Sequence, residues 1–143
     1  MSNTKGFRPR GLGEIAIRCS DIQTMSDFYI NVIGLEPMTG NQTTGIVFLK
    51  IAEGFGGHTT VLALFDMKLG GPDAEPPATG ARSSLHHIAL SLPYDEQDAV
   101  ISWYEKLGQP YRIETFDWIG WRGIFTQDPE GNTVELVAYG PHP

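Results

Sequence analysis

The sequence repeats one order of elements in its two halves, and this repeat limits the possible folds more than any other feature. Residues 13–19 alternate polar and apolar side chains, which is typical of a strand with one buried face. Residues 87–92 alternate in the same way. A helical pattern follows each strand and ends at a glycine, Gly34 in the first half and Gly108 in the second, 74 residues apart. We interpret the chain as an internal duplication.

Three further strands are predicted after each helix, because short runs rich in Val, Ile, Phe and Leu are separated there by glycines. They are expected over residues 35–38, 45–52 and 59–66 in the first half, and over 111–116, 121–127 and 133–139 in the second. Each half therefore has the order strand, helix, three strands.

The middle of the chain separates the two halves, because residues 68–84 gather Gly and Pro among polar residues, as linkers do. A half of about seventy residues cannot easily bury its sheet alone. We therefore predict an α+β fold in which two tandem βαβββ modules form a curved mixed sheet around a concave cavity. The predicted parts are a tail over 1–10 and a single domain over 11–140, made of module one (11–67), the linker (68–84) and module two (85–140).

Both helices have boundary signals in the sequence. Ser20 and, three residues later, Gln23 form a capping-box pattern that predicts the start of the first helix. The second helix is expected from about Asp95 to Leu107.

Composition excludes several classes of function. Ten Lys and Arg residues stand against seventeen Asp and Glu residues, and the net charge of −7 disfavours binding to nucleic acid, which needs clustered positive charge. No apolar run approaches the roughly 18 residues of a membrane-spanning helix. A single cysteine, Cys19, forbids an internal disulfide and fits a reducing compartment. We expect a cytoplasmic protein with neither membrane nor nucleic acid as a partner.

Three segments resemble a known family. Residues 32–36 (VIGLE), 86–90 (HHIAL) and 128–136 (DPEGNTVEL) are similar to motifs of the vicinal oxygen chelate superfamily. That superfamily includes glyoxalase I, bleomycin and fosfomycin resistance proteins and extradiol dioxygenases. The likeness covers about residues 11–140, and it implies the same pair of βαβββ modules.

The resemblance implies a metal site. In the family, ligands come from the first and last strand of each module, and His87 and Glu135 match the two positions in module two. Glu14 stands where module one usually has a histidine, 73 residues before His87. The fourth position falls on Leu62 or Ala63, which are both apolar. Three oxygen and nitrogen donors suit a divalent metal such as manganese, nickel, zinc, iron or magnesium and leave positions open for substrate.

Several roles stay open at this stage. Glu14 can be a metal ligand, a general base, or a carboxylate hydrogen-bonded in a site that has lost its metal. His58 is a weak substitute ligand. By strand parity His86 points away from His87, and we interpret His86 and His142 as structural or solvated.

Aromatic and cationic residues are expected around the cavity. The predicted substrate-binding residues are Phe48, Trp118, Trp121, Arg122 and Phe125. Arg18 and Lys50 share strand faces with Glu14 and Phe48 and are further candidates for binding an anionic group. Cys19 lies on the apolar side of its strand and is expected to be buried and unreactive.

The leading hypothesis is a glyoxalase-like enzyme, of isomerase or lyase type, in which a divalent metal stabilises an enolate or oxyanion of a small substrate. The alternative is a metal-free binding protein of the bleomycin-resistance type. An extradiol dioxygenase is disfavoured, because Phe125 stands where resembling dioxygenases have a tyrosine ten residues before the carboxylate ligand. A homodimer is expected, because resembling proteins commonly cover their open sheet with a second chain.

Overall fold

The computed structural model describes residues 5–38, 45–69 and 78–141. The first four residues of the predicted tail, residues 70–77 of the predicted linker and His142 lie outside the described residues. Among the residues described, no helix is both long enough and apolar enough to cross a lipid bilayer.

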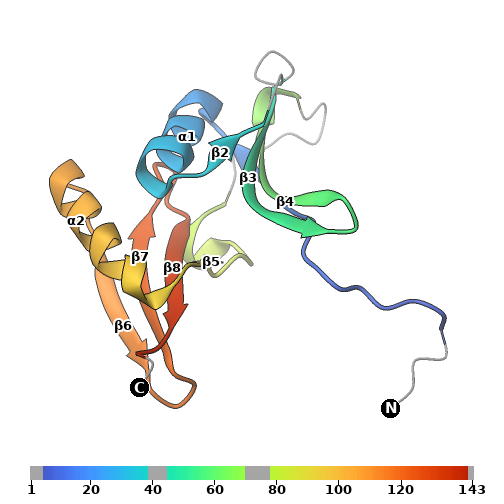
Figure 1. The fold of residues 1–143 in the computed structure, drawn as a ribbon. Coiled ribbons are helices and arrows are strands. Elements are labelled where there is room, and N and C mark those ends of the chain that lie inside the picture. The colour runs from blue at the N-terminus through green and yellow to red at the C-terminus, as the bar shows by residue number, and fades with distance from the viewer. Residues whose placement is uncertain (1–4, 39–44, 70–77, 142–143) are drawn as a thin grey trace.

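Module one has the expected order of elements (Figure 1). Its strands and helices are β1 (Glu14–Cys19), α1 (Ile22–Phe28) with a π-helical continuation η1 (Tyr29–Ile33), β2 (Glu36–Pro37), β3 (Ile46–Phe55) and β4 (His58–Asp66). Two short 3-10 helices, η3 (Met67–Leu69) and η5 (Gly80–Arg82), flank the part of the linker that is not described.

Module two repeats this order. It contains β5 (Ile88–Ser91), a 3-10 turn η6 (Tyr94–Glu96), α2 (Gln97–Leu107), β6 (Arg112–Phe116), β7 (Trp121–Gln127) and β8 (Thr133–Tyr139). The helix begins two residues later than expected, because the chain first makes the tighter turn η6.

The two modules share one strand topology. Module one forms a four-stranded sheet in the order β1-β4-β3-β2, and module two forms one in the order β5-β8-β7-β6. In both sheets the first strand runs parallel to the last, and the other neighbours are antiparallel. The predicted α+β class with tandem βαβββ modules is confirmed.

The strands form two sheets rather than one continuous hydrogen-bonded sheet, since β1 and β5 each lie at an edge of their own sheet. The modules meet through side chains instead. Met25 and Tyr29 of the first helical segment are fully buried in one cluster with Ile88 and Val134 of module two. Figure 1 shows α1 between the two sheets, with α2 on the far side of module two. Packing of α1 therefore joins the modules.

The first helix begins one residue later than the capping-box pattern predicts. Asp21, not Ser20, is the N-cap, and its Oδ1 atom accepts a 3.1 Å hydrogen bond from the Thr24 amide. The carboxylate of Glu130, in module two, accepts hydrogen bonds from the amides of Ser20 and Asp21 at 2.8 and 2.9 Å. These bonds satisfy donors just ahead of the helix, so module two helps to set its start. Gly34 ends the helical segment in a left-handed conformation, as expected.

Candidate functional site

His87 and Glu135 meet on one face of the module two sheet. Glu135 lies in β8 opposite Ala89 of β5, and His87 lies two residues before Ala89, directly ahead of the strand. The Nε2 atom of His87 is 3.1 Å from the Oε1 atom of Glu135. The pair that the resemblance implies is therefore in direct contact.

The carboxylate of Glu135 is deeply placed, with 5% of the residue exposed. Burial raises the pKa of this carboxyl, and the neighbouring His87 opposes the rise. Space for the side chain comes from Gly123 in β7, because a Cβ atom at that position would overlap the Oε2 atom of Glu135. The sequence analysis did not identify this role of Gly123, which only the pairing of β7 with β8 reveals. A buried carboxylate calls for a compensating positive charge or several hydrogen-bond donors.

His86 also contacts the pair, which corrects the parity argument. Its Nδ1 atom is 2.8 Å from the Nδ1 atom of His87, so both ring nitrogens of His87 have a neighbour. Parity fails here because β5 begins at Ile88, and the two histidines therefore precede the regular strand. A bond at Nδ1 orients the ring and directs Nε2 towards Glu135.

An aromatic and cationic wall adjoins the pair. The ring of Phe125 is 5.8 Å from that of His87, and the guanidinium of Arg112 stacks over Phe125 at 4.4 Å. Both residues line a surface depression of about 380 Å³ that also involves Thr133 of β8. Arg112 was not among the predicted residues. The alternation of Arg112 with Glu114 and Phe116 indicates a strand and could have suggested Arg112 as a candidate. Its contact with Phe125 depends on the pairing of β6 with β7, which the sequence pattern does not give.

Module one presents the equivalent face with different chemistry. Ala16 pairs with Ala63 there as Ala89 pairs with Glu135 in module two. Ala63 is therefore the fourth position, rather than Leu62, which packs in the core. Phe48 faces Ala63 as Phe125 faces Glu135. Glu14, two residues before Ala16, is exposed and occupies the place that His87 has in module two.

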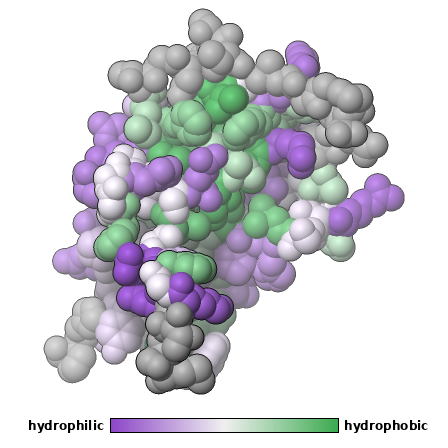
Figure 2. All heavy atoms as spheres, turned by 90° about the vertical axis from the view of Figure 1, so that its right-hand side faces the viewer, coloured by the Kyte–Doolittle hydropathy of each residue, from purple (hydrophilic) through white to green (hydrophobic). Residues whose placement is uncertain are grey.

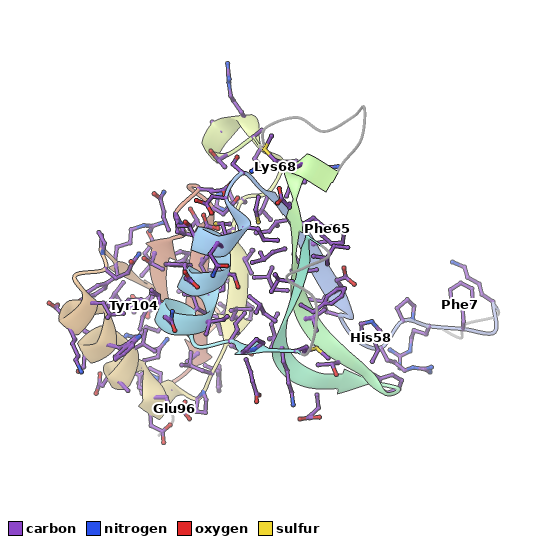
Figure 3. The ribbon with its side chains drawn as sticks, turned by 90° about the horizontal axis from the view of Figure 1, so that it is seen from above. Phe7, His58, Phe65, Lys68, Glu96 and Tyr104 are labelled. Carbon is purple, nitrogen blue, oxygen red and sulfur yellow. The ribbon has the colours of Figure 1, made fainter. Side chains whose placement is uncertain are left out.

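The outer face of the module one sheet combines apolar and charged side chains. Phe48, Phe65 and the buried Val61 and Ala63 share it by strand alternation with Glu14, Arg18 and Lys50. Figure 3 shows Phe65 on the side of β4 that faces away from α1. Seen from that side, apolar side chains form a band with hydrophilic ones around it (Figure 2). Such a surface is typical of an interface or a ligand-binding face.

The other predicted substrate residues do not all join the pair. Arg122 lies on the opposite face of β7 from Phe125, and its guanidinium is 5.6 Å above the ring of Tyr94. Trp121 shares the face of Phe125 and is 46% exposed, whereas Trp118, in the turn before β7, is 83% exposed. The structure thus brings Phe125 and Trp121 to the face of Glu135 and separates Arg122 from it.

The weaker candidates lie elsewhere. Lys50 forms an ion pair with Glu53, and exposed His58 lies against Gly13 at the start of β4. Cys19 is fully buried, and burial together with nearby carboxylates raises the pKa of its thiol to about 12.

The described part of one chain holds no cluster of three or more His, Cys, Asp or Glu side chains suited to a metal ion. His87 and Glu135 are close together, while Glu14 lies in the other sheet. The three predicted ligands are therefore split two and one between the modules.

The duplicated modules and the polar pair on a sheet face define a class of two-module α+β proteins. A family model described as the Glyoxalase/Bleomycin resistance protein/Dioxygenase superfamily matches residues 11–136. The chain belongs to this superfamily, as the sequence motifs predicted. Proteins of the superfamily bind small-molecule substrates and commonly use divalent metals.

Solved structures of the same fold include three of particular interest. A glyoxalase/dioxygenase from Nostoc punctiforme is 18% identical, with a TM-score of 0.69 over 98% of this chain and 100% of that one. Lactoylglutathione lyase from Agrobacterium tumefaciens is 23% identical, with a TM-score of 0.65 over 91% and 94%. The fosfomycin resistance protein FosX from Listeria monocytogenes is 16% identical, with a TM-score of 0.62 over 93% and 96%. No curated protein sequence matches significantly.

Proposed function

We propose that the protein is a metal-dependent enzyme of the glyoxalase-like group, of isomerase or lyase type, acting on a small oxygen-bearing substrate. The observation that carries the proposal is the contact of His87 with the buried carboxylate of Glu135. A buried carboxylate beside a single imidazole is costly without further compensation, and a divalent cation would supply it.

The donor set fits such a metal. An imidazole nitrogen and a carboxylate oxygen suit zinc, nickel, iron or manganese, and a second carboxylate shifts the preference towards manganese or magnesium. Gly123 leaves the room that the Glu135 carboxylate needs. A metal bound there would supply a Lewis acid for negative charge that develops on a substrate oxygen.

The neighbouring residues have distinct tasks around this site. His86 holds the ring of His87 from the Nδ1 side, which fixes its orientation. Phe125 provides an apolar wall. Arg112, which forms an ion pair with Glu114, lies at the edge of the depression, where it can bind an anionic group of the substrate in competition with Glu114. Glu14 would act as the second carboxylate, either as a ligand or as the base that moves a proton at the adjacent carbon.

We assign the missing carboxylate to a second copy of the chain. Glu14 begins β1 and His87 directly precedes the equivalent strand β5, and both strands are sheet edges. A homodimer that sets the start of β1 from one copy beside the start of β5 from the other would bring Glu14 to the His87–Glu135 pair. It would also cover the two exposed sheet edges.

Mixing two inactive variants tests this assignment. A Glu14→Ala chain lacks one half of the site, and a His87→Ala chain lacks the other, so neither variant should bind manganese or nickel stoichiometrically. After the two are unfolded and refolded together, statistical pairing should restore about one intact site per four chains. Metal bound per chain, measured by elemental analysis after gel filtration, gives the result.

A matched pair provides the control. His87→Ala and Glu135→Ala chains carry defects in the same half of the site, so their mixture should restore nothing. Restoration in neither mixture, with stoichiometric metal in the wild type, would place the site within one chain.

A metal-free binding protein is the second candidate, and one observation favours it. The fourth family position is the apolar Ala63, and the described part of one chain gathers only two of the expected ligands. If the wild-type dimer binds none of manganese, nickel, zinc, iron or magnesium, this second function replaces the first.

A further inference from the structure

The chain ahead of β1 forms an arm, residues 5–13, that is held at its root and leaves the body of the molecule. The carbonyl of Gly13 accepts a 3.0 Å hydrogen bond from the Val61 amide, and that of Leu12 accepts a 2.7 Å bond from the Thr60 hydroxyl. The guanidinium of Arg10 lies 5.2 Å above the ring of Phe55. Beyond this point the arm projects outwards, and Phe7 lies far from both sheets (Figures 1 and 3).

The arm differs from the rest of the chain in charge. It contains Lys5, Arg8 and Arg10 and no acidic residue, whereas the remainder carries seven positive against seventeen negative side chains. It also exposes apolar side chains, since Phe7 is 67% and Leu12 54% exposed. A basic arm with exposed apolar side chains is complementary to an acidic, aromatic surface, and the body of the same protein is acidic.

A surface of that kind lies where β5 and β8 end. Leu92, Pro93, Tyr94, Asp95, Tyr139 and Pro141 line a depression of about 570 Å³. Asp95 continues into Glu96 and Asp98, which give the start of α2 a negative charge. The ring of Tyr139 supplies apolar surface, with 61% of the residue exposed. Aromatic rings beside carboxylates can bind both apolar and guanidinium groups, and the ring of Tyr94 already lies under the guanidinium of Arg122.

The position of this depression matches the path of an arm from a second copy. In the dimer under "Proposed function", on which this inference rests, the starts of β1 and β5 from two copies lie side by side. In the antiparallel arrangement of these two edge strands, the residues before Glu14 run along β5 towards Ser91. Residues 10–13 then span the four residues of β5, because extended segments have the same rise of about 3.3 Å per residue. Residues 7–9 reach the depression.

We propose that the arm of each copy lies along β5 of the other and seats Phe7, Arg8 and Pro9 in the depression formed by Tyr94, Asp95 and Tyr139. The exchange is reciprocal, so each dimer contains two such contacts. The acidic surface at the start of α2 thus serves as a docking surface for a second copy of this chain.

Charge reversal in the full chain tests the pairing of the arm with Asp95. Arg8→Glu places like charges together, and so does Asp95→Arg, so each should raise the dimer dissociation constant about tenfold or more in sedimentation velocity at low salt. The double variant Arg8→Glu with Asp95→Arg should restore most of the affinity. Lys106→Glu, on α2 beside Trp103, changes the net charge as Arg8→Glu does and should leave the constant unaltered.

A cross-link tests the position directly. Phe7→Cys chains mixed with Tyr139→Cys chains should give a covalent dimer under mild oxidation, while Cys19 stays buried and unreactive. Phe7→Cys mixed with Ile113→Cys, a site on β6 that is 42% exposed against 61% for Tyr139, should give little.

The failures can be told apart. If neither charge reversal changes the dimer dissociation constant and no cross-link to position 139 forms, the exchanged arm is wrong. The metal complementation test is unaffected by that result. A monomer at all concentrations overturns both proposals.

Discussion

The phenolic hydroxyl of Tyr29 donates a 2.7 Å hydrogen bond to the Oδ2 atom of Asp128, 99 residues further along the chain. Both residues are buried. Asp128 also accepts bonds from the amides of Glu130 and Asn132, which shape the turn between β7 and β8. One carboxylate therefore connects the helical segment of module one to a turn of module two, and burial raises the pKa of Tyr29 so that its hydroxyl keeps its proton.

Replacing Tyr29 by Phe should destabilise the protein by about 1–3 kcal/mol, because the buried Oδ2 atom keeps only the Asn132 side chain as a donor. Urea unfolding followed by fluorescence measures the change. Tyr111→Phe removes an exposed hydroxyl bond to Glu105 and should cost less than about 0.5 kcal/mol. Equal losses for the two variants would contradict the role of the Tyr29 bond.

Gly123→Ala should displace the Glu135 carboxylate from His87, because the new Cβ atom would overlap Oε2. We expect a loss of about 1–3 kcal/mol in the free energy of unfolding, together with loss of metal binding. In the double variant Gly123→Ala with Glu135→Ala the overlap with the carboxylate disappears and only the close approach to the Phe125 ring remains, so the combined loss should be smaller than the sum of the two single losses. Additive losses in urea unfolding would show that the carboxylate does not need this space.

Cys19 should resist thiol reagents in the folded protein, because a pKa of about 12 leaves almost no thiolate at pH 8. Ellman's reagent should react only after urea is added. The same pKa difference makes the stability of the protein depend on pH. The unfolded thiol loses its proton from about pH 9 while the folded thiol keeps it, so the free energy of unfolding that Cys19 contributes should fall between pH 9 and 12. Cys19→Ala should lack this part of the fall, and equal pH profiles for both proteins would contradict it.

Catechol ring cleavage should be slow or absent, even when the protein has first been loaded with ferrous iron under anaerobic conditions. Phe125 has no hydroxyl, and losing a positioned proton-transfer group typically costs about 10²–10⁴ in rate. Oxygen uptake after addition of aerated catechol measures the activity. Phe125→Tyr combined with Glu14→His should give a trace of uptake. Brisk uptake by the unaltered protein would make dioxygenase the first choice.

The duplication was readable from local patterns. Alternation over residues 13–19, a helical period and a glycine stop at Gly34 all depend on neighbours within a few residues, and the structure has each of them. The pairing of His87 with Glu135 was implied by the resemblance to the superfamily, and the parallel register of β5 with β8 brings the two side chains together.

Other features of the structure depend on contacts between distant segments, which local sequence patterns do not predict. The N-cap of α1 is Asp21 rather than the predicted Ser20. The backbone amide of Asp21 donates a hydrogen bond to Glu130, more than a hundred residues away. Arg122 has the right residue type for substrate, but the register of β7 turns it towards Tyr94.

The sequence by itself determined the two modules and their order of elements, because strand alternation and helix ends are short-range effects. The resemblance of its motifs to the superfamily implied the polar pair. The tertiary structure alone decided that Ala63 rather than Leu62 stands at the fourth position, and that Gly123 makes room for Glu135. It also decided that β1 and β5 remain sheet edges. These features follow from strand register and from the packing of α1 between the sheets, which bring together residues that lie far apart in sequence.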